Sequence, residues 1–136
     1  LMASCAAMSW AGVEGIGTKT MTKVTSTETV TVGKGDRVMV HATGSIKETE
    51  FQFWSTKDAG QKPYSYQAGV GGVIKGWDQG LLGAKLGETR LLDIPAEEGY
   101  GSRGFPAWGI TPNAGLLFEI EVLEINGKGM KKQDDL

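Results

Sequence analysis

The sequence has little of the residues from which most catalytic and metal sites are built. Among its 136 residues it has one cysteine, Cys5, and one histidine, His41. A single cysteine cannot form a disulfide within the chain, and with one histidine it leaves too few ligands for a zinc site. His41 falls in a segment with strand periodicity, where we expect a structural role. We expect neither a metal site nor a cofactor.

Charge of one sign and long apolar runs are also scarce. The chain has 14 Lys and Arg against 16 Asp and Glu, a formal net charge of -2 at pH 7. Nucleic acids and anionic membranes attract proteins through concentrated basic patches, which this balance does not provide. No stretch approaches the roughly 20 apolar residues of a membrane span. We expect no nucleic-acid partner and no membrane partner.

Targeting signals are weak at both ends of the sequence. Residues 1–17 have neither the basic start nor the sustained apolar run of a secretory signal. The last four residues, Gln133, Asp134, Asp135 and Leu136, are similar to acidic, leucine-ending retention signals of the endoplasmic reticulum. Such a signal has no use without an entry signal. We expect a cytoplasmic protein, with the endoplasmic reticulum as the alternative.

The composition indicates one folded domain with a tail on each side. Hydrophobic residues make up 40% of the chain and charged residues 22%, which is ordinary for a globular protein of this length. Residues 1–22 are rich in small residues without periodicity and are expected to form a flexible tail, in which Trp10 has no assigned role. The domain is expected over 23–126, followed by a charged tail over 127–136.

Hydrophobic periodicity predicts mostly strands within that domain. Alternation of apolar and polar residues indicates strands near 28–32, 38–43, 51–56, 64–67, 89–94 and 118–122. Apolar positions recur at helical spacing over 73–86, although Gly76, Gly80 and Gly83 weaken a helix there. The predicted fold class is therefore α+β, with an antiparallel sheet of five to six strands wrapped around one short amphipathic helix.

Three segments carry the strongest functional signal. Val73-Ile74-Lys75-Gly76-Trp77-Asp78-Gln79-Gly80 opens the predicted helix, Glu98-Gly99-Tyr100-Gly101 follows a strand, and Phe105-Pro106-Ala107-Trp108-Gly109-Ile110 leads into Leu116-Leu117-Phe118-Glu119. In this order and spacing, over about residues 28–125, the chain resembles the FKBP family of macrolide-binding immunophilins. The resemblance implies a peptidyl-prolyl cis-trans isomerase that acts on proline-containing polypeptides and assists folding.

The resemblance also implies roles for particular residues. Trp77 would form the floor of an aromatic pocket, and the N–H of Ile74 and the hydroxyl of Tyr100 would donate hydrogen bonds to the substrate. Phe51 is an alternative to Phe53 as a wall. The candidate catalytic residues are Tyr100, Phe53, Trp77 and Phe118. The candidate ligand-binding residues are Tyr64, Val73, Ile74, Phe105, Trp108 and Ile110, of which Trp108 could instead contact a partner protein.

Two positions depart from the family pattern. The family often has a tyrosine where this chain has Ala42, and an aspartate where it has Trp54. We expect Trp54 to fill volume left by Ala42, giving a narrower, more apolar pocket with reduced affinity for tacrolimus or rapamycin. The alternative function is an FKBP-like binding module with little catalysis. We expect a monomer in either case.

Overall fold

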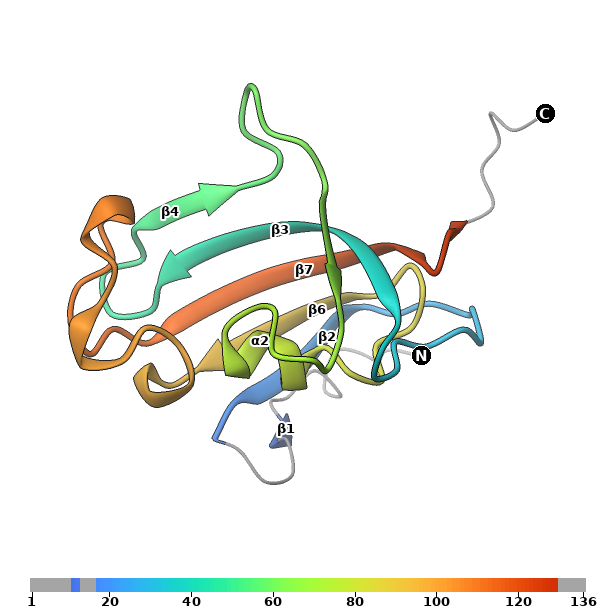
Figure 1. Ribbon diagram of the computed structural model, residues 1–136, viewed down its shortest axis with the longest axis horizontal. Coiled ribbons are helices and arrows are strands. Elements are labelled where there is room, and N and C mark those ends of the chain that lie inside the picture. The colour runs from blue at the N-terminus through green and yellow to red at the C-terminus, as the bar shows by residue number, and fades with distance from the viewer. Residues whose placement is uncertain (1–10, 13–16, 130–136) are drawn as a thin grey trace, which may run out of the picture.

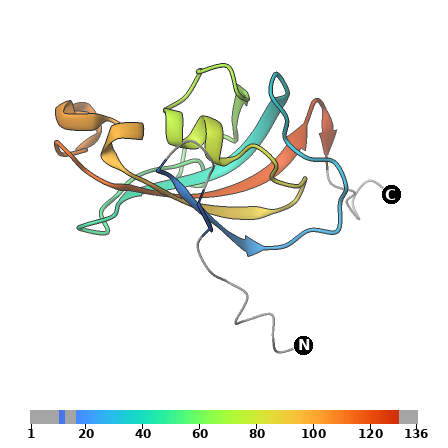
Figure 2. The ribbon, with the colours of Figure 1, turned by 90° about the horizontal axis from the view of Figure 1, so that it is seen from below.

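A curved antiparallel sheet holds one short helix on its concave side (Figure 1; Figure 2). The computed structural model describes residues 11–12 and 17–129. The strands are β1 (Ala11–Gly12), β2 (Lys19–Val24), β3 (Arg37–Ile46), β4 (Gln52–Ser55), β5 (Tyr64–Gln67), β6 (Thr89–Ile94), β7 (Leu116–Ile125) and β8 (Lys128–Gly129). The helix α2 spans Lys75–Gly80, and three single-turn 3-10 helices follow β6: η1 (Ala96–Glu98), η2 (Gly101–Arg103) and η3 (Pro106–Trp108).

Two long central strands organise the sheet. Its order is β1-β2-β6-β7-β3-β4, with β5 also paired to β3 and β8 to β7, and every pairing is antiparallel. Strand β3 pairs with β7 from Val38 opposite Ile125 to Ile46 opposite Leu116. Buried residues alternate with half-buried ones along both strands, so one face packs against the helix. The predicted fold class is confirmed.

Helix α2 is shorter than the periodicity predicted and depends on its contact with β6. A Cβ built on Gly76 would lie 2.5 Å from a side-chain carbon of Ile94 and 2.6 Å from the Thr18 hydroxyl. Glycine at this position therefore lets the helix backbone lie almost directly on the sheet. Leu81, which is fully buried, caps the helix, and the chain then turns instead of continuing to Leu86. An isolated helix of this length would not be stable in water.

The predicted strand over 28–32 is not part of the sheet. The only ladder contact there is an isolated bridge between Thr31 and Lys85. The N–H of Val32 donates to Ala84 O at 2.9 Å, and the N–H of Leu86 donates to Val30 O at the same distance. The loop after α2 therefore supplies the hydrogen-bond partners that a neighbouring strand would otherwise provide.

The structure moves both predicted domain boundaries outward. Strand β2 pairs with β6 from Lys19 opposite Asp93, so the tail predicted over 1–22 is wrong for its last residues. Thr18 is fully buried, and its hydroxyl and N–H donate to Glu98 at 2.6 and 3.0 Å. At the other end, β8 pairs with β7, although the sequence assigned it to a tail. Trp10, Cys5 and the last four residues lie outside the described residues. No described helix is long and apolar enough to cross a bilayer.

Candidate active site

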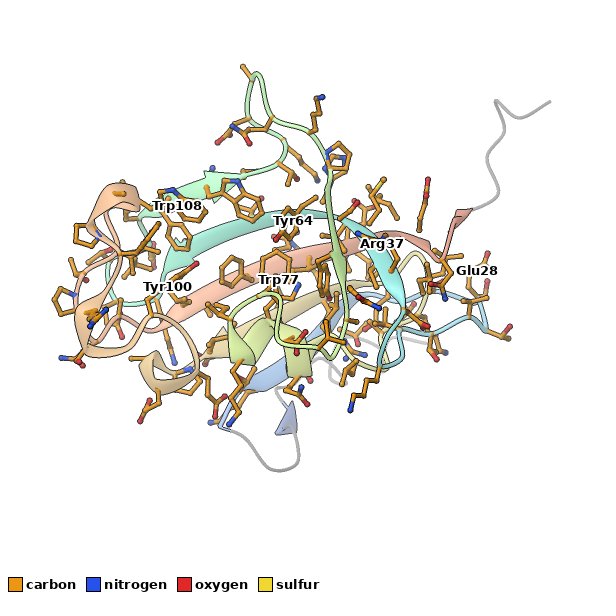
Figure 3. All side chains as sticks on the ribbon, viewed as in Figure 1. Glu28, Arg37, Tyr64, Trp77, Tyr100 and Trp108 are labelled. Carbon is orange, nitrogen blue, oxygen red and sulfur yellow. The ribbon has the colours of Figure 1, made fainter. Side chains whose placement is uncertain are left out.

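An apolar cavity lies between the start of α2, strand β4 and the loops after β6 (Figure 3). It has a volume of about 170 Å³ and is partly open to solvent. We call this cavity the cup. Its lining contains no carboxylate, amine, guanidinium or imidazole. The lining residues are Trp54, Tyr64, Gly72, Val73, Ile74, Trp77, Tyr100, Trp108 and Phe118.

Trp77 forms the floor of the cup. It projects from α2, is 4% exposed, and is surrounded by rings from β4, β5 and β7. Its indole centroid lies 5.0 Å from the Phe118 ring and 5.7 Å from the rings of Tyr64 and Tyr66. Burial strongly raises the pKa of the Tyr66 hydroxyl, which leaves this tyrosine neutral. The floor is therefore held on several sides by aromatic contacts, which favours a rigid surface.

A β-bulge in β4 turns two consecutive aromatic residues toward the same side. The register with β3 shifts between Gly44 and Ser45, which leaves Phe53 as an extra residue in β4. Bulges change the direction of side chains in this way. The ring centroids of Phe53 and Trp54 lie 6.3 and 6.2 Å from that of Trp108, and both rings are nearly parallel to it. Trp54 lines the cup, whereas Phe53 packs against Trp108 and Phe118 without lining it.

Gly44 is required where β3 passes beneath these rings. A Cβ at this position would lie 2.6 Å from the Phe118 ring and 2.8 Å from the Phe53 ring. The alternation of apolar and polar residues predicted a strand that ends at residue 43, but β3 continues to Ile46. The glycine therefore marks the close approach of two aromatic side chains to the backbone.

The loop that carries Trp108 is held at its base. The N–H of Phe105 donates to Ile110 O at 2.8 Å, and the N–H of Ile110 donates to Phe105 O at 3.1 Å. Between these residues, Pro106 begins the 3-10 turn η3. Trp108 is 43% exposed at the tip, and Phe105 stacks on Tyr100 with centroids 5.4 Å apart. The paired base presents a large aromatic side chain at the rim of the cup.

Two donors can face a bound peptide. Burial raises the pKa of the Tyr100 hydroxyl, so it remains a protonated donor at neutral pH. Ile74 is the N-cap of α2, where backbone N–H groups have no acceptor within the helix. The preceding turn is fixed by the buried carboxylate of Asp78, which accepts from the N–H of Gly69 at 2.8 Å and of Gly71 at 3.0 Å.

The structure brings most of the predicted site residues together. Three of them do not line the cup: Phe53 packs against Trp108, Phe105 packs outside Tyr100, and Ile110 is buried in the core at 2% exposure. Trp54 was expected to narrow the pocket but was not among the candidate site residues, and it also lines the cup, since the bulge in β4 directs it there. The predicted residues that line the cup are Tyr64, Val73, Ile74, Trp77, Tyr100, Trp108 and Phe118.

His41 lies outside the cup, on the sheet. Its Nδ1 is 2.9 Å from the hydroxyl of Thr56, which places it in a structural hydrogen bond between β3 and the end of β4. Across residues 11–12 and 17–129, no three His, Cys, Asp or Glu side chains are grouped so that they could hold a metal ion.

Comparison with known proteins decides the family. Residues 28–123 match the family described as FKBP-type peptidyl-prolyl cis-trans isomerase. The chain belongs to the FKBP family. It is therefore an enzyme of the peptidyl-prolyl cis-trans isomerase class, and a binding module without catalysis is not favoured.

Individual relatives show the extent of the similarity. The chain is 54% identical over 93 residues to peptidyl-prolyl cis-trans isomerase FKBP12 of Arabidopsis thaliana, an alignment that covers 67% of this chain and 83% of the relative. The isomerase of the same name from Vicia faba is 53% identical over 92 residues, with 66% and 82% covered. The crystal structure of AtFKBP13 superimposes with a TM-score of 0.72 at 34% identity, covering 89% of this chain and 99% of that one.

Proposed function

We propose that the protein catalyses rotation about X-Pro bonds of polypeptides in the cup, with Trp77 as the surface on which the proline ring rests. The observation that carries this proposal is the uncharged aromatic lining with a protonated hydroxyl, that of Tyr100. Rotation needs no acid, base or metal, because no bond is made or broken.

The physical basis of catalysis is the difference between a planar and a twisted amide. Rotation about a peptide bond has a barrier of about 18 to 20 kcal/mol, because the nitrogen lone pair is delocalised into the carbonyl. The planar amide is more polar than the twisted one, and an apolar cup solvates it less well than water does. The cup therefore favours the twisted state relative to the planar state, which lowers the barrier.

Two donors would fix the substrate backbone during rotation. In this proposal the N–H of Ile74 binds a carbonyl beside the proline, and the Tyr100 hydroxyl binds a second backbone carbonyl. Phe53 and Phe118 hold the walls, since their rings meet edge to face at 5.8 Å. A hydrogen bond of this kind contributes about 0.5 to 1.5 kcal/mol. Binding and orientation, rather than proton transfer, would account for the rate.

Exchange of a short X-Pro peptide, followed by NMR, tests this proposal. The parent should accelerate cis-trans exchange at substoichiometric concentration, and Tyr100→Phe should lower kcat/KM by roughly threefold to tenfold through loss of one hydrogen bond. Val24→Ala is a matched surface control, because Val24 is 51% exposed at the end of β2, away from the cup. A folded parent that leaves the exchange rate unchanged would favour the binding-module alternative.

We propose further that macrolides such as tacrolimus and rapamycin bind with reduced affinity. Trp54 supports this proposal, because its indole forms part of the cup wall and stacks on Trp108, where the family often has an aspartate. Ala42, where the family often has a tyrosine, is buried in the core at 1% exposure. Ala42→Tyr combined with Trp54→Asp would restore the pair common in the family and should strengthen tacrolimus binding. Equal affinities of the parent and the double variant would contradict this proposal.

The protein is also proposed to act as a monomer. Support comes from the cup itself, whose floor and walls can be formed by the residues of a single chain. Analytical ultracentrifugation at the concentration of the activity assay tests this, and activity that rises with dimer formation would refute it.

A further inference from the structure

The side chain of Glu98 joins the residues before β2 to the turn that precedes Tyr100. Its Oε2 accepts from the N–H of Gly17 at 2.6 Å. Its Oε1 accepts from the N–H and from the hydroxyl of Thr18, at 3.0 and 2.6 Å. We call Gly17, Thr18 and the Glu98 side chain the clasp. None of the three residues lines the cup, and the clasp connects segments that are 80 residues apart in the sequence.

The clasp depends on an ionised carboxylate, because both oxygens of Glu98 accept hydrogen bonds. Burial acts to raise the pKa of this carboxyl, but hydrogen bonds from Thr18 and Gly17 and the nearby charge of Lys75 outweigh it and hold the pKa below its usual range. Hydrogen bonds to an ionised acceptor are stronger than those between neutral groups. The clasp is therefore formed at neutral pH.

Thr18 also contacts the helix that carries the floor of the cup. It is fully buried, and a Cβ built on Gly76 would lie 2.6 Å from its Oγ1. Gly76 directly precedes Trp77 in α2. The hydroxyl that donates to Glu98 is thus packed against the backbone beside Trp77. The clasp therefore connects the helix that carries the floor with the turn that leads to Tyr100.

A single glycine, Gly99, separates Glu98 from Tyr100. Glycine has more backbone freedom than other residues, so local backbone preference does not fix the direction in which the chain reaches Tyr100. The turn η1 before this glycine is closed by the N–H of Glu98, which donates to Pro95 O at 2.9 Å. A Cβ built on Gly17 would lie 3.3 Å from Pro95 Cγ, so the clasp also packs against the start of this turn. The clasp therefore holds the chain on the N-terminal side of Gly99.

We propose that Glu98 is a positioning residue for the reaction, which through the clasp sets the place of the Tyr100 hydroxyl relative to Trp77. This inference rests on the proposed function, in which that hydroxyl donates to a carbonyl of the substrate. A hydrogen bond weakens steeply when its donor is displaced or misaligned. A small shift of η1 therefore removes the contribution of the hydroxyl although the tyrosine itself is present. Glu98 affects the rate without touching the substrate.

A double-mutant cycle between Glu98 and Tyr100 tests the inference, with kcat/KM for a short X-Pro peptide as the readout. Glu98→Ala should lower kcat/KM by about threefold to tenfold, which is the contribution of one hydrogen bond. In the Tyr100→Phe background, Glu98→Ala should change kcat/KM by less than about twofold, because the hydroxyl that it positions is already absent. Glu97→Ala is the matched control, because Glu97 is an exposed carboxylate in the same turn, and it should leave kcat/KM unchanged.

Two variants of Thr18 test the clasp with Glu98 in place. Thr18→Val lacks the hydroxyl that donates to Glu98 and should lower kcat/KM by about twofold to threefold. Thr18→Ser keeps a hydroxyl and should keep the parent kcat/KM. Circular dichroism at the assay temperature shows which variants are folded. If Glu98→Ala unfolds, Thr18→Val replaces it in the cycle with Tyr100→Phe.

The outcomes separate this inference from the proposed function. Effects of Glu98→Ala and Tyr100→Phe that multiply in the double variant would show that Glu98 acts on the cup by another route, and would overturn the inference. An unchanged kcat/KM in Glu98→Ala, or equal losses in Glu98→Ala and Glu97→Ala, would also overturn it while leaving isomerase activity in the cup intact. A parent that does not accelerate the exchange would refute both proposals.

Discussion

Replacement of Gly44 by alanine should damage the cup, although Gly44 is not itself one of the lining residues. The added Cβ would lie 2.6 Å from a carbon of the Phe118 ring and 2.8 Å from one of the Phe53 ring. Ordinary contact begins near 3.4 Å, so the Phe118 ring would have to move by about 0.8 Å. Overpacking of a well-packed core costs about 1 to 3 kcal/mol. We therefore expect Gly44→Ala to lower the free energy of unfolding by about 2 kcal/mol.

Activity should fall further than stability alone explains. Phe118 lines the cup beside Trp77, and Phe53 packs against Trp108, so the same shift disturbs the wall of the cup and its rim. A displacement of about 1 Å in an active site can reduce the rate by about 100-fold. Urea unfolding and kcat/KM for an X-Pro peptide measure the two effects. Gly12→Ala is the matched control, since nothing lies within 4 Å of its added Cβ. A Gly44→Ala variant as stable and active as the parent would refute this reasoning.

Three further predictions concern buried polar groups. Burial acts to raise the pKa of Glu88, but hydrogen bonds from Thr22, the Lys85 N–H and Arg90 outweigh it and lower that pKa. Glu88→Gln should therefore lower the free energy of unfolding by about 2 kcal/mol at pH 7. Because the folded pKa is below the unfolded one, the parent's advantage is present above the unfolded pKa and lost as pH falls through the folded pKa. Melting temperatures of parent and variant should converge in acid, and a gap that widens there would contradict this. Thr18→Val removes the hydroxyl that donates to Glu98 and should cost about 1 kcal/mol in urea unfolding, whereas Thr18→Ser should cost less. Asp78→Asn weakens the anchor of the Gly69 to Gly71 turn and should raise KM more than it lowers kcat; an unchanged KM in a peptide assay would rule out this anchoring role.

The sheet and the helix could be predicted because their periodicity is local. Val38, Val40 and Ala42 alternate with half-buried neighbours along β3, as their sequence pattern indicated. The helix was predicted too long because periodicity alone does not show where the chain meets β6. Gly76 and Gly80 indicated a weak helix, but their close contact with Thr18 comes from a segment nearly 60 residues earlier in the sequence. Such long-range packing leaves no periodic pattern.

The candidate site could be predicted mainly through the motif, and least where the backbone is irregular. Trp77, Tyr100 and Phe118 occupy the positions that the family resemblance implied. Trp54 was expected to narrow the pocket, but its place beside Phe53 could not be predicted, because a regular strand would direct the two side chains to opposite faces. Only the bulge places both rings beside Trp108. The spacing of apolar residues therefore locates the strands and the helix. Which side chains line a cavity depends on β-bulges and on where side chains pack closely against the backbone of another strand.

The central claim is that the cup catalyses X-Pro isomerisation, and refolding of a protein limited by proline isomerisation tests it most directly. The rate of the slow refolding phase would be measured against enzyme concentration, with and without rapamycin, for the parent and for Tyr100→Phe combined with Phe53→Ala. The account expects acceleration proportional to parent concentration, weak inhibition by rapamycin, and loss of acceleration in the folded double variant. No acceleration by the parent, or full activity in the double variant, would contradict it.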